Sequence, residues 1–271
     1  MRYGKFIAFI VAAGLVAPAF GALQQVTDNF NSNTDSYWDG VGNRTSPQNF
    51  GWSNSDNTGN SVNPPSGTAT GGGEMGGQIT RNGNIQAYYA FNVGSVTSSD
   101  VLSASGVYQY VSGSGGINIG WFLGATSTGS GGDDRNFIGI SLDDGKNVYT
   151  HASTGSGDYR EQASDIPTLT AGVTYPFSIV FDPAANGGQG TITATFGNST
   201  HVENIQSGVI GSIPALDHFG LFPVGSSAVH TVTAYMDDLT FTSANPLPAP
   251  EPASLGMLSA GAILLSRRRR C

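Results

Sequence analysis

The sequence predicts an all-β protein whose main body is a single antiparallel β-sandwich. Short runs in which apolar and polar residues alternate recur along the chain, separated by clusters of Gly, Ser, Asn and Asp. Strong helix formers never gather over a long window of the body. Alternation with a period of two indicates strands with one buried face, and many short strands joined by turn clusters are typical of sandwiches.

The alternation is clearest in four runs between residues 117 and 196. Each run places large apolar side chains at every second position, as a strand with one face in the core requires. The residues expected to point inward are Ile117, Ile119, Trp121 and Leu123; Ile138, Ile140 and Leu142; Phe177, Ile179 and Phe181; and Ile192, Ala194 and Phe196.

Two turn signals separate these runs. Asp143-Asp144-Gly145 indicates a hairpin, because Asp and Gly tolerate the positive φ angles of tight turns. Asn186-Gly187-Gly188 has the same role with a longer loop. Residues 31–77 are rich in Asn, Ser and Gly, so we expect long loops around few strands there.

The first 21 residues have the three-part composition of a secretory signal peptide. Arg2 and Lys5 precede an apolar stretch at residues 6–16, and the small residues Ala19 and Gly21 place a cleavage site before Ala22. An uncleaved anchor is the alternative, but the apolar stretch is short for one. We therefore expect a signal helix at 1–21, export, and an ectodomain at 22–245.

The C-terminal end predicts contact with a membrane. A Pro-rich spacer at 246–252 leads into Ala253–Ser266, 14 residues without a charge, and then into Arg267–Arg270. As a helix this stretch would be about 21 Å long, against a bilayer core of about 30 Å. Arginine side chains that reach toward the headgroups recover part of the deficit. The alternative, a buried C-terminal helix, does not explain four adjacent like charges, so we expect a short membrane helix at 253–271.

The order of these features resembles the PEP-CTERM sorting signal of Gram-negative bacteria. The resemblance covers about the last 25 residues. The matching residues are Pro250, Glu251, Pro252, Arg267, Arg268, Arg269 and Arg270. It implies export by the secretion machinery, a transient stay in the inner membrane and recognition by an exosortase. Removal of the tail and delivery to the cell surface or extracellular matrix would follow.

The body is strongly acidic and has no cysteine. Residues 22–245 contain five Lys or Arg against 18 Asp or Glu, a net charge of −13. This balance argues against a nucleic-acid partner, which needs basic side chains on its phosphates. The lack of cysteine excludes disulfides, thiol catalysis and cysteine-based zinc sites.

Motifs of the common hydrolases are missing from the body. Its three glutamates, Glu74, Glu161 and Glu203, begin no Glu-x-Asp-x-x-Glu strand of the kind that positions two carboxylates for retaining glycoside hydrolysis. No Gly-x-Ser-x-Gly elbow accompanies the four histidines. The sequence therefore predicts a non-catalytic surface or matrix protein that is a candidate polysaccharide binder. The alternatives are a polysaccharide-degrading enzyme of the same fold, either glycosidase or lyase, and a purely structural coat component.

Two short motifs stand at the ends of the body, "TDNFN…SYW" near its start and "VTAYMDDLTFT" at its end. They resemble the concanavalin A-like group, including laminin G-like jelly rolls and calcium-containing carbohydrate-binding modules. The resemblance implies a jelly-roll topology and a structural Ca²⁺ between the first and last strands, bound by Asp28 with Asp237 or Asp238. The alternative for the acidic pair is a solvated or bulged strand.

Sugar binding would require exposed aromatic rings beside polar groups. Trp52 lies in the polar stretch "NFGWSNSDN", and Tyr159 and Arg160 lie in "GSGDYRE". These three side chains are the expected glycan contacts, whereas most other aromatic residues are expected in the core.

The tail yields the first testable prediction. If the Pro-Glu-Pro, apolar and arginine order directs sorting, mass spectrometry of protein released from the cell surface will find no peptide within residues 255–270. Replacing Arg267–Arg270 with serine removes the positive stop and should release protein past the membrane. Recovery of the intact C-terminus from mature surface protein would refute the sorting role.

Overall fold

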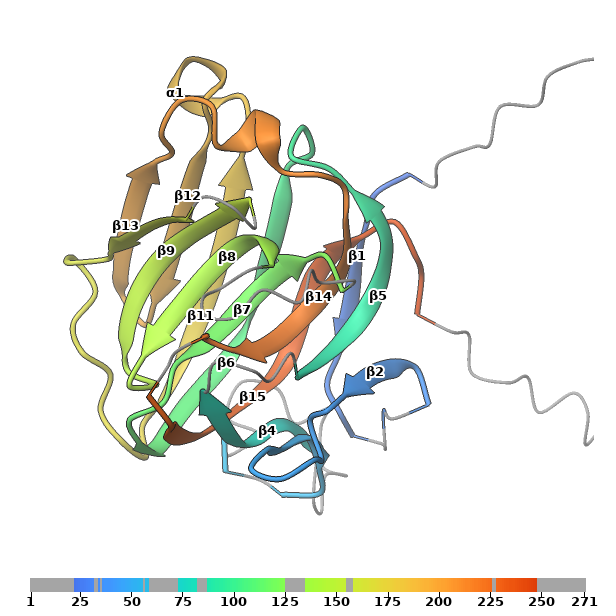
Figure 1. The fold of residues 1–271 in the computed structure, drawn as a ribbon, viewed down its shortest axis with the longest axis vertical. Helices are drawn as coiled ribbons and strands as arrows, with labels where there is room; N and C mark the ends of the chain where they lie inside the picture. Colours follow the sequence, from blue (N-terminus) through green and yellow to red (C-terminus); the bar gives the residue numbers. More distant parts are fainter. Residues whose placement is uncertain are drawn as a thin grey trace, which may run out of the picture.

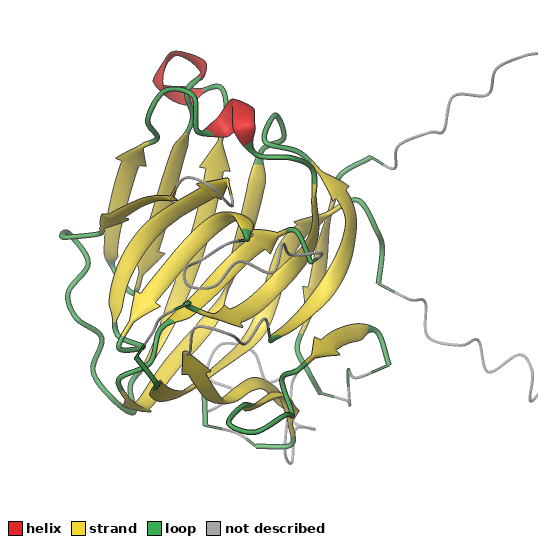
Figure 2. Ribbon diagram, in the orientation of Figure 1, coloured by secondary structure: helices red, strands yellow, loops and turns green. Residues whose placement is uncertain are grey.

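Two antiparallel β-sheets pack face to face in the computed structural model, which confirms the predicted all-β sandwich (Figures 1 and 2). The structure describes residues 22–247, with gaps at 32–33, 35, 56, 59–72, 82–86, 125–134, 155–157 and 226–227. The predicted signal helix, the sorting signal and the C-terminal membrane helix lie outside the described residues. Within the described ranges no helix is both long and apolar enough to span a bilayer.

The first sheet has eight strands, in the order β13-β12-β11-β6-β15-β4-β3, with β1 also paired to β15. Its strands are β1 (Gln24–Asp28), β3 (Asn49–Ser53), β4 (Glu74–Arg81), β6 (Leu102–Gly113), β11 (Thr174–Asp182), β12 (Thr191–Phe196), β13 (Ser199–Asn204) and β15 (His230–Ser243).

The second sheet has seven strands, in the order β10-β9-β8-β7-β14-β5-β2. Its strands are β2 (Trp38–Val41), β5 (Tyr88–Val96), β7 (Ile117–Phe122), β8 (Asn136–Asp143), β9 (Asn147–Thr154), β10 (Asp158–Gln162) and β14 (Leu216–Pro223). In Figure 1 this sheet lies in front, and one of its faces is turned toward the viewer. The helical segments are short, α1 (Ala185–Gly188) and a 3₁₀ turn at Ile210–Ser212.

The four alternating runs form β7, β8, β11 and β12, and their apolar residues point between the sheets as predicted. All of these side chains are buried in one core cluster except Leu123, which is partly buried at its margin. The hairpin between β8 and β9 turns through Asp144 and Gly145, whose φ angles are 53° and 67°. Two consecutive positive φ values are what a tight hairpin turn needs, so the Asp-Gly signal is confirmed.

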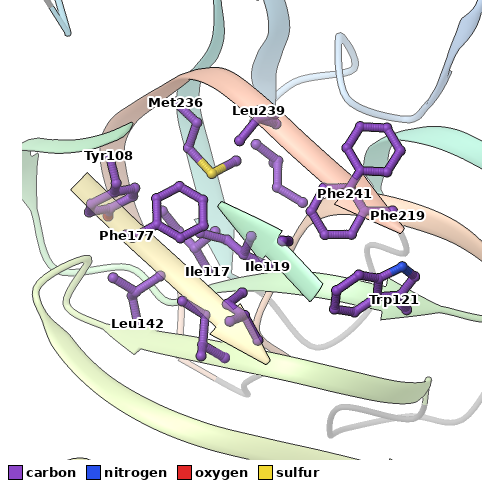
Figure 3. Close-up of a cluster of buried hydrophobic side chains, with 14 of the residues drawn as sticks. Tyr108, Ile117, Ile119, Trp121, Leu142, Phe177, Phe219, Met236, Leu239 and Phe241 are labelled. Atoms are coloured by element: carbon purple, nitrogen blue, oxygen red, sulfur yellow. The ribbon is translucent and has the colours of Figure 1, made fainter. Parts of the chain in front are cut away.

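Aromatic side chains join the two sheets at the centre of the core. Phe241 of β15 stacks on Phe219 of β14, with ring centroids 4.4 Å apart and planes 15° apart. Phe219 also contacts Trp121 of β7 at 4.9 Å, and the Trp121 indole N–H donates to the carbonyl of Thr242 at 2.9 Å. The Phe219–Phe241 stack (Figure 3) and the Trp121–Thr242 hydrogen bond cross from one sheet to the other, so they hold the two layers in a fixed relative position.

The long strand β15 pairs with three other strands of the eight-stranded sheet. Its first half pairs with β4 and its second half with β1, while β6 runs along the other edge. The register with β6 shifts between Asp237 and Thr240, and Asp238 has a φ of 51°. A bulged residue changes the direction of the neighbouring side chains. Here the bulge separates Asp237 and Asp238, which differ in burial.

The aromatic contact between the sheets generates a stability prediction. Phe219→Ala leaves a cavity among buried rings and should lower the free energy of unfolding by about 3–5 kcal/mol. The control Val202→Ala removes a side chain that is 57% exposed and should change it by less than about 0.5 kcal/mol. Urea denaturation measures both, and equal effects would show that the Phe219 contact does not hold the sheets together.

Candidate functional site

The outer face of the seven-stranded sheet carries a dense set of polar and aromatic side chains. Because side chains alternate, the residues between the core positions of β7, β8 and β9 all point to this face. Three glycines, Gly139, Gly120 and Gly220, lie opposite one another on adjacent strands in one register row. Without side chains of their own they leave room for neighbours, and the ring of Phe137 lies over Gly120 and Gly139. The middle of the face is therefore occupied by the Phe137 ring, and polar side chains lie on either side of it.

On one side of the glycine row lies His151, which is fully buried. Its Nδ1 atom is 2.6 Å from the hydroxyl of Ser141, and that hydroxyl donates to the side-chain oxygen of Asn118. Ser141 and Asn118 are also fully buried and lie opposite each other on β8 and β7. The ring of Phe137 meets the imidazole edge to face, 5.0 Å between centroids and 74° between planes. His151 is thus fixed by a polar chain on one side and by an aromatic ring on the other.

Next to His151, Arg160 of β10 reaches across the face. Arg160 lies directly opposite His151, and its guanidinium carbon is 4.1 Å from the centroid of the Tyr149 ring. One guanidinium nitrogen is 2.7 Å from a carboxylate oxygen of Asp143, which also lies 3.9 Å from Arg81. The side chains of Arg160, Arg81 and Asp143 are each 21–28% exposed. Each of these side chains therefore keeps some exposed surface, although the Nε atom and one Nη atom of Arg160 are buried.

A second cationic group lies beyond the glycine row. The guanidinium of Arg135 lies 5.1–5.4 Å from the ring centroids of Tyr88, Phe122 and Phe222. Burial lowers the pKa of Arg135 to about 10, so the side chain keeps its charge at neutral pH. The three rings stabilise that charge through their electron-rich faces.

His218 lies beside this group between two carboxylates. Its Nδ1 atom is 2.6 Å from Asp217, and its Nε2 atom is 3.4 Å from Asp39. Its ring stacks on Phe122 at 5.7 Å and contacts Tyr88 at 5.2 Å. Burial and the nearby charge of Asp39 raise the pKa of the Tyr88 phenol, so Tyr88 stays protonated as a hydrogen-bond donor.

The predicted glycan contacts are only partly brought to this face. Arg160 lies on it, but Tyr159 points the opposite way, toward the core, and donates from its hydroxyl to Glu203 at 2.5 Å. Trp52 was expected in an exposed loop and instead belongs to β3, where it packs against the core and donates to the carbonyl of Phe30 at 2.9 Å. Both corrections have one cause, since each ring satisfies its polar atom inside the sandwich.

The acidic residues expected to bind calcium lie near the bulge of β15. Asp28 accepts hydrogen bonds from the backbone N–H of Phe30 and the indole of Trp38, each at 2.8 Å. Asp237 is almost fully buried and accepts from the N–H of Asp238 at 2.7 Å, whereas Asp238 is partly exposed. Nearby Glu74 is fully buried and accepts hydrogen bonds from the backbone N–H groups of Asn57 and Thr58 at 3.0 Å.

Burial raises the pKa of Asp28. Burial, together with the charges of Asp238, Glu74 and Asp28, raises the pKa of Asp237 to about 8. Among the residues that the structure describes, no group of three or more His, Cys, Asp or Glu is arranged to hold a metal ion. Calcium binding by Asp28 with Asp237 or Asp238 therefore stays a prediction.

Comparison with known proteins identifies no family for this chain. No family model and no curated protein matches the chain. Among solved structures, a protein of unknown function from Shewanella oneidensis MR-1 is 9% identical with a TM-score of 0.48, covering 88% of this chain and 96% of its own. A family 7 alginate lyase is 11% identical with a TM-score of 0.44, covering 63% and 80%. An endo-β-1,4-glucuronan lyase from Trichoderma reesei is 14% identical with a TM-score of 0.39, covering 64% and 82%.

These neighbours correct the expectation that the body is not an enzyme. Several of the solved structures that it resembles are polysaccharide lyases, so the lack of hydrolase motifs is no ground for excluding catalysis on this fold. Sequence reasoning searched for paired carboxylates and a serine elbow, and so it passed over His151, Tyr149, Ser141 and Asn118. The signal that could have found them is their spacing, since they occupy the positions between the inward apolar residues of three strands.

Asp237 generates a prediction about pH. The folded state binds a proton at Asp237 more tightly than the unfolded chain, so the stability of the protein should fall as pH rises from about 4 to about 8. Asp237→Asn removes the buried charge and should make the protein more stable than the parent by at least about 1 kcal/mol near pH 9. Thermal melts at about pH 5 and pH 9 measure this difference. Asp144→Asn, in the β8–β9 turn, is the matched control, and an Asp237→Asn variant that is less stable at the higher pH would contradict the prediction.

Proposed function

We propose that the outer face of the seven-stranded sheet binds an acidic polysaccharide and cleaves it by β-elimination, as a polysaccharide lyase does. The single observation that carries this proposal is the placement of scarce positive charge. Residues 22–245 contain only five basic side chains, and three of them, Arg81, Arg135 and Arg160, reach this face. In a body with a net charge of −13, such a concentration indicates an anionic ligand.

The groups beside Arg160 have the chemistry that β-elimination requires. A uronic acid unit loses the proton on the carbon that bears its carboxyl group, and a double bond forms to the next carbon as the glycosidic oxygen leaves. The Arg160 guanidinium pairs with the carboxylate and stabilises the negative charge that develops when the proton is removed. His151 is the base that takes the proton, and the Tyr149 phenol donates one to the leaving oxygen. Atoms and charges balance without water or a cofactor.

The carboxylates of the face fit hydrolysis poorly. Hydrolysis of a glycoside needs two carboxylates on opposite sides of the scissile bond. On the described part of this face Asp143 is paired with Arg160, and Asp217 and Asp39 both contact His218. Asp217 also accepts from the N–H of Gly124 at 2.7 Å. The lyase alternative therefore has more support from the side chains than the glycosidase alternative. Because His151 is fully buried, the glycan has to replace part of what covers the imidazole.

The destination of the protein is a separate proposal, based on its two ends. We propose that the chain is exported and that an exosortase processes its C-terminal signal at the inner membrane of a Gram-negative bacterium, leaving the body at the cell surface or in the matrix. An enzyme acting on polysaccharide in that place would meet extracellular polymers directly. A structural Ca²⁺ bound by Asp28 with Asp237 or Asp238 is part of the same proposal.

Incubation of the purified protein with alginate, polyguluronate and glucuronan tests the activity. We expect an increase in ultraviolet absorbance, because each cleavage leaves a conjugated double bond on the new non-reducing end. Arg160→Lys should lower kcat/KM by about tenfold or more, since lysine cannot pair with a carboxylate through two parallel N–H groups.

Arg44→Lys is the matched control. Arg44 donates to Asn49 at 2.9 Å and to the carbonyl of Trp52 at 2.6 Å, away from the outer face. The same substitution there should leave kcat/KM within about a factor of two. Release of reducing ends without the absorbance increase would indicate hydrolysis, and turnover that is indifferent to Arg160→Lys would remove this face from the mechanism.

A further inference from the structure

We infer that Ser141 and Asn118 are positioning residues that fix the tautomer of His151, with the proton on Nδ1 and the lone pair on Nε2. The inference starts from the number of protons available to a three-membered chain. A neutral imidazole carries one N–H, a serine hydroxyl carries one O–H, and the side-chain oxygen of an asparagine carries none. Once the side-chain oxygen of Asn118 faces Ser141, the donor and acceptor of both hydrogen bonds among Asn118, Ser141 and His151 are therefore fixed.

The hydroxyl proton of Ser141 is committed to Asn118. The Ser141 hydroxyl donates to the Asn118 side-chain oxygen, which can only accept. The hydroxyl oxygen is then left with its lone pairs, and the atom 2.6 Å away from it is Nδ1 of His151. Two acceptors do not approach so closely without a proton between them, so Nδ1 carries the N–H. The single remaining lone pair of the neutral ring belongs to Nε2.

The sheet holds this chain rigidly. Asn118 and Ser141 are register partners on β7 and β8, so the first hydrogen bond spans two adjacent strands. His151 lies on β9 opposite Gly139 of β8, one diagonal step from Ser141. All three polar residues are fully buried, so bulk water does not compete for these hydrogen bonds.

The same protons exclude a different chemistry. A serine nucleophile must give its proton to the histidine, whereas here the serine gives it to an amide oxygen and accepts from the histidine. Ser141 is therefore not an activated nucleophile. A base, in contrast, needs an oriented lone pair, and the chain provides one on Nε2. The use of that lone pair in catalysis rests on the proposed function, but the tautomer does not.

Nitrogen NMR of the full-length chain labelled with ¹⁵N-histidine reads the tautomer directly. The two-bond nitrogen–proton correlations of His151, assigned by their loss in His151→Gln, should show the Nδ1–H form at neutral pH. Asn118→Leu removes the acceptor and frees the Ser141 proton for Nδ1, so the correlations should switch to the Nε2–H form. Ser141→Thr keeps the hydroxyl and should keep the wild-type tautomer.

Ser243→Ala is the matched control, because Ser243 is an equally buried serine that is not part of the Asn118–Ser141–His151 hydrogen-bond chain. Its hydroxyl donates to the carbonyl of Asn245 at 2.7 Å. It should leave the His151 correlations unchanged. An Nε2–H tautomer in the wild-type protein, or labelling of Ser141 by a fluorophosphonate probe, would overturn the inference even if the variants do not fold. Activity is read separately: Asn118→Leu should lower kcat by about 10²-fold. An Nδ1–H tautomer in a protein without lyase activity would refute the proposed function and leave this inference standing.

Discussion

The register of the seven-stranded sheet is the constraint on which the candidate site depends. Phe219 of that sheet stacks on Phe241 of the other at 4.4 Å, and the Trp121 indole is bonded to the backbone of Thr242. With these inward residues fixed, the alternate positions of the same strands can only face outward. A slip of one residue would bury the polar set among the core rings and turn the core rings outward. The aromatic packing between the sheets therefore determines where His151, Ser141 and Asn118 lie.

The part of the fold that sequence reasoning predicted is the part governed by local periodicity. Ile138, Ile140 and Leu142 repeat every second position and are buried together, because alternation is a property of a single strand. Trp52 and Tyr159 were mistaken for loop residues because their partners are distant in the sequence. Tyr159 bonds to Glu203 across 44 residues, and Trp52 to Phe30 across 22. Polar surroundings in the sequence indicate exposure only when no distant strand covers the residue.

The candidate site was harder to predict for the opposite reason. Asn118, Ser141 and His151 are polar residues at alternate positions, a pattern that normally indicates a solvent-facing side of a strand. In the structure they are as buried as the core residues between them. A fully buried polar group is costly unless its hydrogen bonds are made, so these three are stable only as a set. No single one of them carries a sequence signal, because what distinguishes them is that they lie on three neighbouring strands.

Electrostatic forces on an acidic polysaccharide would be repulsive at long range and attractive at short range. At long range a body with a net charge of −13 repels an acidic polysaccharide, and this repulsion acts over the Debye length, about 8 Å at physiological ionic strength. At short range Arg160 and Arg81 attract carboxylates, although the negative charge of Asp143 partly neutralises them. A uronate that binds Arg160 has to compete with Asp143. The Asp143 carboxylate occupies the position of the substrate carboxylate when no substrate is bound. Salt weakens the exposed long-range repulsion more than the contact with Arg160, whose side chain is only 21% exposed. Under the proposed function, the acidic surface would limit how fast the polymer arrives, and the partly buried arginine would determine which polymer stays.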